Sequence, residues 1–239
     1  MNLEDGISSL KTFFLEILGF LLPGLVFWFA FYFFVKPHNQ EDINLQIKFD
    51  GVEYFLLVVS YVFGYVLHGI CEWINENRFL KKWIGSQNWE DKIIGLPSYK
   101  RAIGKVNEGI LEEDKKIQER DVKSVRNFAM STLPEIENHK IYTFMFRAEL
   151  SFKIAASFIL LLILVCLSIL TDTISYKYSK SYLGIFKADG YAFVCYFLIF
   201  ISALFLIKTY RRFYNIAMKL PLSIFISDRY ASRTNPATP

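Results

Sequence analysis

Two ionisable side chains lie close to long apolar segments in this 239-residue sequence, where a charge would be costly. Glu16 directly precedes one uncharged segment, and His68 lies about one helical turn before the end of another. We expect both near the same membrane boundary, where they could pair with each other, with Lys153 or with Lys208. Two alternatives remain open: solvation of both groups at the interface, or a site for a proton or another ion.

His68 also belongs to a stripe on one apolar segment whose members recur at steps of four: Ser60, Gly64, His68, Glu72 and Glu76. Each step advances a helix by about 40° beyond a full turn, so the stripe stays on one broad face. Its small residues allow close helix packing, and its polar residues could line a wet vestibule. His68 and Glu72 have the spacing of metal ligands, but the other two histidines fall on opposite sides of the membrane in the topology below, so no metal site is expected.

Pro23 and Gly24 interrupt the middle of the first apolar segment. One interpretation is a kink that is tolerated because neighbouring helices pack around it. The alternative is a hinge in a helix that moves or lines a pore.

A group of basic residues flanks the third and fourth apolar segments and forms a predicted basic collar: Arg147, Lys153, Lys208, Arg211 and Arg212. Such a collar usually orients the chain and contacts anionic lipid headgroups. It could instead receive a nucleotide or RNA, but basic residues without a fold motif are weak evidence for this. We do not expect a nucleic-acid partner.

Motifs for catalysis are absent, since the sequence has no P-loop and no GxGxxG, GxSxG or HExxH pattern. The three cysteines are scattered, without a CxxC pair, and are expected to be buried free thiols. We therefore predict a protein that is not an enzyme and has no cofactor.

The elements that position these residues are four apolar segments, at 17–35, 54–71, 154–170 and 191–207. Each is close to the length of about 20 residues that crosses a bilayer as a helix. The third and fourth lack the polar stripe of a soluble helix. The first lacks the basic start and small-residue cleavage site of a signal peptide, so we interpret it as a retained span. The predicted fold is an all-α membrane protein with four transmembrane helices and helical cytoplasmic extensions.

The distribution of Lys and Arg predicts the orientation of the four spans. Five lie in the two segments between paired spans, and eleven lie near the span ends on the other side. Both termini and the central segment are therefore expected in the cytoplasm, with the spans in the bacterial inner membrane. The predicted parts are a first transmembrane hairpin (1–71), a cytoplasmic helical region (72–153), a second transmembrane hairpin (154–207) and a cytoplasmic C-terminal helix and tail (208–239).

Several local predictions follow for the polar regions. Residues 112–130 have apolar positions at helical spacing and predict an amphipathic helix, and 135–171 predicts one continuous helix. The second span is expected to continue to about Trp83. The fourth should continue past Arg212 until Pro221 interrupts or kinks it. The predicted loop is marked by Gly95, Pro97 and Gly104, and 43–49 alternates apolar with polar residues as a short strand would.

Three short elements resemble those of small multi-span bacterial inner-membrane proteins of unknown biochemistry. They are Leu22, Pro23 and Gly24 in the first span, residues 142–152 (YTFMFRAELSF), and residues 210–214 (YRRFY). Some such proteins accompany phage-defence systems, including CRISPR accessory membrane proteins, and are thought to act as oligomeric membrane effectors. The resemblance implies a homo-oligomer whose cytoplasmic stems sense a signal and whose spans perturb the bilayer. It carries over no catalytic residue.

The first hypothesis is therefore a non-enzymatic, pore-like membrane effector that responds to a cytoplasmic signal such as a small ligand. The second is a membrane-anchored scaffold or accessory subunit that docks a cytoplasmic protein through its central region. A third is a small transporter that uses Glu16 and His68, although four spans are few for such a protein.

Overall fold

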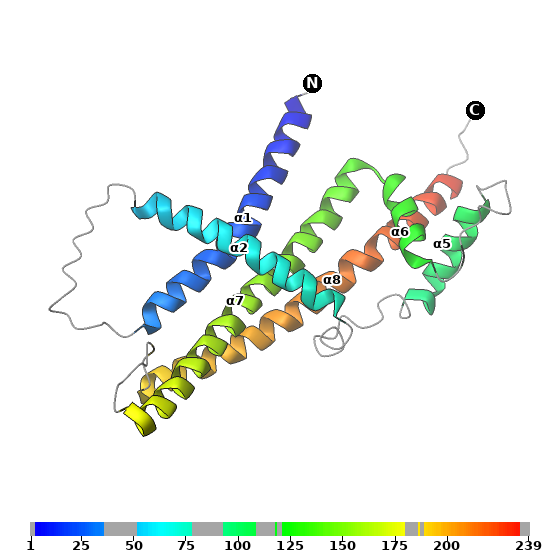
Figure 1. The fold of residues 1–239 in the computed structure, drawn as a ribbon. Helices are drawn as coiled ribbons and strands as arrows, with labels where there is room; N and C mark the ends of the chain where they lie inside the picture. The colour runs from blue at the N-terminus through cyan, green and yellow to red at the C-terminus, as the bar shows by residue number, and fades with distance from the viewer. Residues whose placement is uncertain are drawn as a thin grey trace. The chain divides into compact units, whose positions relative to one another are not determined.

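The computed structural model describes residues 3–35, 52–77, 93–108, 118, 121–179, 186 and 189–234. Within these residues the chain forms α-helices without a strand, apart from one isolated bridge between Val35 and Phe186 (Figure 1). The helices are α1 (Leu3–Phe34), α2 (Val52–Glu76), α5 (Pro97–Glu108), α6 (Val122–Ser131), α7 (Glu135–Ser179) and α8 (Gly190–Thr234). The prediction of an all-α fold is confirmed.

Four of these helices are long and apolar enough to cross a membrane, and each contains one of the predicted segments except for Val35, which follows the end of α1. The candidate spans are Phe13–Phe34, Tyr54–Glu76, Glu137–Thr171 and Gly190–Phe225. Many large apolar side chains on them point outward, such as Phe29 at 77% exposed and Tyr54 at 75%. An exposed apolar surface of this extent suits helices whose solvent is lipid. The helices therefore support a multi-pass membrane protein.

The chain divides into two compact units that share α7 and α8. Unit 1 comprises Met1–Asn77 and Glu149–Thr209, and unit 2 comprises Arg78–Ala148 and Tyr210–Pro239. Unit 1 therefore holds α1, α2 and the apolar parts of α7 and α8. Unit 2 holds α5, α6, the start of α7 and the last part of α8.

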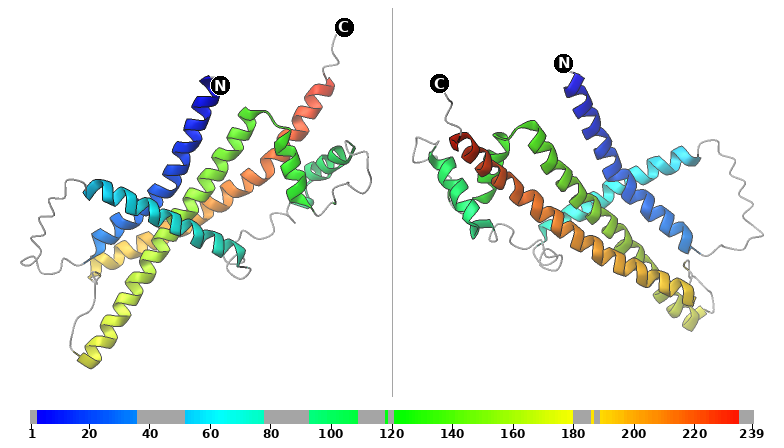
Figure 2. Two further views of the ribbon diagram at one scale, coloured as in Figure 1. Left: turned by 45° about the horizontal axis from the view of Figure 1, so that its top comes forward. Right: turned by 180° about the vertical axis from the view of Figure 1, so that it is seen from behind.

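Unit 1 has two packing regions along its helices. In the first, α1 and α2 cross, as both Figures 1 and 2 show. In the second, Phe27 and Phe34 of α1 are buried together with Leu161 of α7 and Tyr196 of α8. Aromatic contacts dominate there, with ring centroids 4.7 Å apart for Phe34 and Tyr196.

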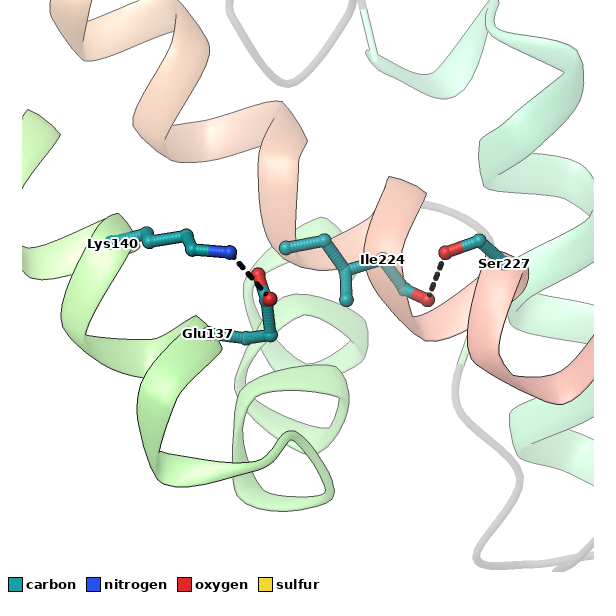
Figure 3. Close-up of polar contacts among 4 residues, drawn as sticks. All are labelled: Glu137, Lys140, Ile224 and Ser227. Atoms are coloured by element: carbon teal, nitrogen blue, oxygen red, sulfur yellow. Dashed lines mark hydrogen bonds and ion pairs between the residues drawn. The ribbon is translucent and has the colours of Figure 1, made fainter. Parts of the chain in front are cut away.

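Unit 2 has a small hydrophobic core of its own, to which four helices contribute. Its buried members are Ile93, Tyr99, Ala102, Val106, Val122, Val125, Ala129, Leu133, Ile141, Met218, Leu222 and Phe225. On its surface, Lys140 Nζ lies 2.7 Å from Glu137 Oε1, and Ser227 Oγ donates a 2.8 Å hydrogen bond to the Ile224 carbonyl (Figure 3). Exposed contacts of this kind add little stability, so burial of the core holds unit 2 together.

The predicted loop is confirmed at Gly95, which lies in a turn, and is wrong at Pro97 and Gly104, because Pro97 begins helix α5. Proline suits the first position of a helix, where its missing N–H needs no partner and its fixed φ is already helical. Gly104 lies inside α5 with no atom within 4 Å of the place that a Cβ would take. The short helix is held by its buried face, which includes Tyr99 and Val106.

The lengths of the other helices differ from prediction in several places. α7 begins at 135 as predicted and ends at Ser179, beyond 171. α2 ends at Glu76 and does not reach Trp83, in a stretch whose asparagines are poor helix formers. α8 continues through Pro221, which is buried and does not end the helix. The predicted strand at 43–49 lies outside the described residues.

The amphipathic helix predicted at 112–130 corresponds to α6, which starts only at Val122; residues 109–117 lie outside the described residues. Asp121 caps α6, because its Oδ1 accepts a 3.2 Å hydrogen bond from the Ser124 N–H. Hydrogen bonds from the Ser124 side chain and backbone lower the pKa of the Asp121 carboxyl below its usual range.

Replacing Asp121 tests this cap. We expect Asp121→Ala to lower the thermal midpoint of unit 2, and Asp121→Asn, an equally good N-cap, to retain it at pH 7. Since the folded pKa is lowered, the carboxylate's contribution is present above the unfolded pKa of about 3.9 and is lost as the pH falls below it. Thermal unfolding followed by circular dichroism between pH 3 and 7 measures this. A pH profile of Asp121→Asn as steep as that of the wild type contradicts the assignment.

Candidate functional site at the crossing of the first two spans

The helices α1 and α2 cross with their backbones in contact, and two glycines make this possible. A Cβ on Gly24 would overlap the carbonyl group of Ser60, and a Cβ on Gly64 would overlap the carbonyl group of Phe20. The two contacts are reciprocal. Gly24 of α1 meets Ser60, which lies four residues before Gly64, and Gly64 of α2 meets Phe20, which lies four residues before Gly24. Small residues at such spacing are the typical means of close packing between membrane helices.

A third helix joins the crossing through a buried hydroxyl group. Ser157 of α7 donates from Oγ to the carbonyl of Pro23 at 2.9 Å, with the Lys153 carbonyl as an alternative acceptor at 3.0 Å. Ser157 and Pro23 are both fully buried. The hydrogen bond therefore ties α7 to α1 next to Gly24.

One polar atom in the crossing has no partner. The Oγ of Ser60 is buried and accepts or donates no hydrogen bond within the described residues. An unsatisfied buried hydroxyl is destabilising by about 1–3 kcal/mol. The crossing is therefore closely packed, but it buries one hydroxyl group, that of Ser60, without a hydrogen bond among the described residues.

Lys153 places a cation inside unit 1. The residue is 4% exposed, and its Nζ lies 4.2 Å from the centroid of the Phe20 ring and 3.9 Å from Glu149 Oε2. A desolvated cation over an aromatic face is stabilised by about 2 kcal/mol or more. Lys153 was predicted in the basic collar, and the structure places its ammonium group over the aromatic ring of Phe20 from α1.

The Phe20 ring also contacts the polar stripe on α2. The His68 ring lies edge-on to it with centroids 5.5 Å apart, and Tyr65 is 5.2 Å away. His68 Nε2 is 3.5 Å from Glu72 Oε1. Glu72 and Cys71 are also close enough to Lys153 to act on its charge. The structure therefore gathers His68, Glu72 and Lys153 around Phe20.

Glu16 does not join this cluster. It is exposed, and within the described residues it forms no ion pair with His68 or Lys153. Pro23 and Gly24 are both buried at the helix crossing, where packing surrounds them. A hinge at these two residues stays a prediction.

The remaining collar residues fall in both units. Arg147 of unit 2 lies 5.9 Å above the Phe213 ring, and Arg212 of the same unit is exposed. Lys208 of unit 1 is exposed, and Arg211 of unit 2 is half-buried. The three cysteines are free thiols as predicted, but only Cys71 is buried, because Cys166 faces outward on its span.

An apolar cavity opens beside the crossing. It has a volume of about 920 Å³ and is lined by seven side chains of α1 together with Leu56 of α2 and Phe158 of α7. Trp28 lines it, and the Trp28 Nε1 is buried without a hydrogen-bond partner among the residues described.

In the part of the chain that the structure describes, no three His, Cys, Asp or Glu side chains are arranged to hold a metal ion. Comparisons with family models, curated proteins and solved structures find no match to this chain. The site must therefore be interpreted from its own geometry.

Sequence reasoning missed Phe20 and Ser157. Phe20 lies four residues before Gly24, as Ser60 lies before Gly64, and this equal spacing is the signal that could have paired the two helices. Ser157 is a single hydroxyl in an apolar segment, a residue type that commonly joins membrane helices. Its partner, a backbone carbonyl on another helix, leaves no trace in the sequence.

The glycines of the crossing give a direct test. We expect Gly24→Ala and Gly64→Ala each to destabilise the protein by about 1–3 kcal/mol, because the added Cβ would meet backbone that cannot move aside alone. Thermal unfolding in detergent measures the effect. Gly69→Ala is the matched control, because it lies on α2 with nothing within 4 Å of the added Cβ and should be neutral or slightly stabilising. Equal effects at Gly64 and Gly69 would rule out the close crossing.

Lys153 offers a second test of the same region. Replacing a buried charge with an apolar residue of similar volume is often neutral or stabilising by about 1–4 kcal/mol. We therefore expect Lys153→Met to be at least as stable as the wild type, and Lys153→Glu to be much less stable because it faces Glu149. Lys208→Met, at an exposed position on α8, should change little. A large loss of stability in Lys153→Met would show that the ammonium group contributes more than its burial costs.

Proposed function

We propose that this chain is a non-enzymatic membrane effector that acts as a homo-oligomer in the bacterial inner membrane. Unit 2 would receive a cytoplasmic signal, and unit 1 would respond by altering the bilayer or opening a pore. Phage defence is the setting that the resemblance of its short elements implies. The proposal places both termini in the cytoplasm, on the side rich in Lys and Arg.

The observation that carries this proposal is the continuity of two helices. α7 and α8 each contain 45 residues and contribute to both units. Ile141 and Leu161 on α7 belong to the cores of unit 2 and unit 1 respectively. A rearrangement of unit 2 therefore acts on the same helices that pack in unit 1, without a flexible linker between them on α7 or α8.

The crossing supplies an element on which such a movement can act. α7 is joined to α1 by the hydrogen bond from Ser157 to Pro23 and by the contact of Lys153 with Phe20. Both contacts are specific in position, so a rotation or shift of α7 would break them. The unsatisfied Ser60 hydroxyl and the buried Lys153 charge make this packing less stable than an all-apolar one. The free-energy difference between this packing of the helices and an alternative one is thereby reduced, which would make a switch between the two easier.

A test of this function combines oligomeric state with membrane integrity. We expect chemical cross-linking in native membranes to give a defined oligomer. We also expect the purified chain in liposomes to release a trapped dye several-fold faster than empty liposomes. Gly24→Leu, which would separate α1 from α2, should abolish release, and Gly69→Leu serves as the control on the open face of α2. A monomeric protein in tight liposomes, together with an unchanged membrane potential in expressing cells that receive the triggering signal, would refute the effector proposal.

One observation favours a second candidate, a membrane-anchored scaffold. Unit 2 has its own buried core and could dock a cytoplasmic protein while the spans only anchor it. Residues 72–153 alone would lack Met218, Leu222 and Phe225 of that core, so the full chain is needed to separate the two candidates. Gly24→Leu should leave a scaffold active and an effector inactive.

A further inference from the structure

Unit 2 contains buried nitrogen atoms that its own side chains leave unused. Arg126 Nε on α6 and His139 Nε2 on α7 are both buried without a hydrogen-bond partner among the described residues, as is one oxygen, Asn138 Oδ1. Buried polar groups are nearly always paired, so each exception needs an explanation. Two such atoms on adjacent helices of one unit point to a missing partner.

Arg126 occupies a core-facing position of α6. Its neighbours on the same face, Val122, Val125 and Ala129, are all buried. No carboxylate of the described residues forms an ion pair with the Arg126 guanidinium. Burial lowers the pKa of Arg126 below its ordinary value, an effect opposed by the nearby Tyr214 and Tyr142 side chains. Arginine nevertheless remains a cation at neutral pH.

The neighbours of Arg126 come from two further helices. Tyr142 lies on α7, one helical turn after His139, so that the two share a face. Tyr214 lies on α8, and its ring is 5.5 Å from that of Tyr210. A guanidinium, an imidazole and phenol groups are all able to donate hydrogen bonds. Among the described residues no acidic side chain acts on the charge of Arg126, so the group is suited to an anion.

The turn between α6 and α7 fixes this arrangement. The Asn138 side-chain amide donates to the carbonyls of Met130 and Leu133, at 3.2 and 3.3 Å. These bonds hold the end of α6 against the start of α7. They thereby hold α6, which carries Arg126, next to the first turns of α7, which carry His139 and Tyr142.

We propose that Arg126, with His139, Tyr142 and Tyr214, binds a phosphate group. The planar guanidinium presents several donors in a fork that matches phosphate oxygens, and donors from three helices suit a tetrahedral anion better than a planar carboxylate. The phosphate could belong to a soluble compound or to a lipid headgroup. The idea that this phosphate compound is the signal to which unit 2 responds rests on the proposed function. Its binding, however, can be measured without any membrane activity.

The test uses the full chain in phosphate-free detergent, with thermal stability as the readout. Anything that binds only the folded state raises the midpoint as its concentration increases. The soluble arms compare sodium phosphate with sodium acetate at equal ionic strength. The lipid arm compares nanodiscs of phosphatidylcholine with and without phosphatidic acid.

Two variants identify the site. Arg126→Gln removes the charge and should weaken binding about tenfold or more, whereas Arg101→Gln, an exposed position on α5, should bind as the wild type does. The chain has three histidines, so the His139 imidazole can be assigned by comparison with His139→Gln in spectra of histidine-labelled protein. Its resonance should shift when the ligand is added, and this measurement does not depend on the folding of Arg126→Gln.

Each outcome decides the proposal. A rise of the midpoint with phosphate, lost in Arg126→Gln only, supports it with a soluble source, and a rise with phosphatidic acid alone supports it with a lipid source. It is overturned if neither probe raises the midpoint, which would leave an internal water as the partner of these atoms. It is also overturned if acetate acts as strongly as phosphate, or if Arg126→Gln responds like the wild type.

Discussion

The contact between the backbones of α1 and α2 is the constraint on which the rest of unit 1 depends. Gly64 lies against the Phe20 carbonyl, and the ring of the same Phe20 covers the Lys153 ammonium group. Gly24 lies against Ser60, and the adjacent Pro23 accepts the hydrogen bond from Ser157. The two polar contacts with α7, from Ser157 and from Lys153, are therefore made by Pro23 and Phe20, which lie at the two glycine contacts between α1 and α2. In lipid, where apolar surface gains little from burial, such close packing largely decides which helices associate.

The span helices were predictable because lipid solvation depends on composition over about 20 residues and not on distant contacts. The crossing was partly predictable, since Ser60 and Gly64 are the small residues of a stripe at four-residue steps that the sequence shows. The helix α5 does not follow from the sequence, because Pro97 and Gly104 are typical of loops, whereas a proline at a first helical position also favours a helix. Proline and glycine can mark either a loop or the start or interior of a helix. Burial of Tyr99 and Val106 on one face of α5 stabilises the helix here.

The environment of Lys153 could not be predicted from its sequence position. A lysine just before an apolar segment usually extends to the membrane surface, and nothing within α7 distinguishes Lys153 from such a residue. Its burial depends on Phe20, which lies more than 100 residues away in the chain. Arg126 is a different case. It stands between the apolar residues Val122 and Ala129 at helical spacing, so a core-facing arginine was visible in the sequence but not recognised.

The placement of Lys153 over Phe20 has a consequence for biogenesis. Chains are synthesised from the N-terminus, and earlier segments generally fold first. The segments of α1 and α2 are thus synthesised before α7, and the aromatic ring of Phe20 is already available when the ammonium group of Lys153 follows. The order of the helices in the chain then provides the buried Lys153 charge with its aromatic partner during insertion. A circular permutant that began with α7 would expose that charge to lipid without its ring.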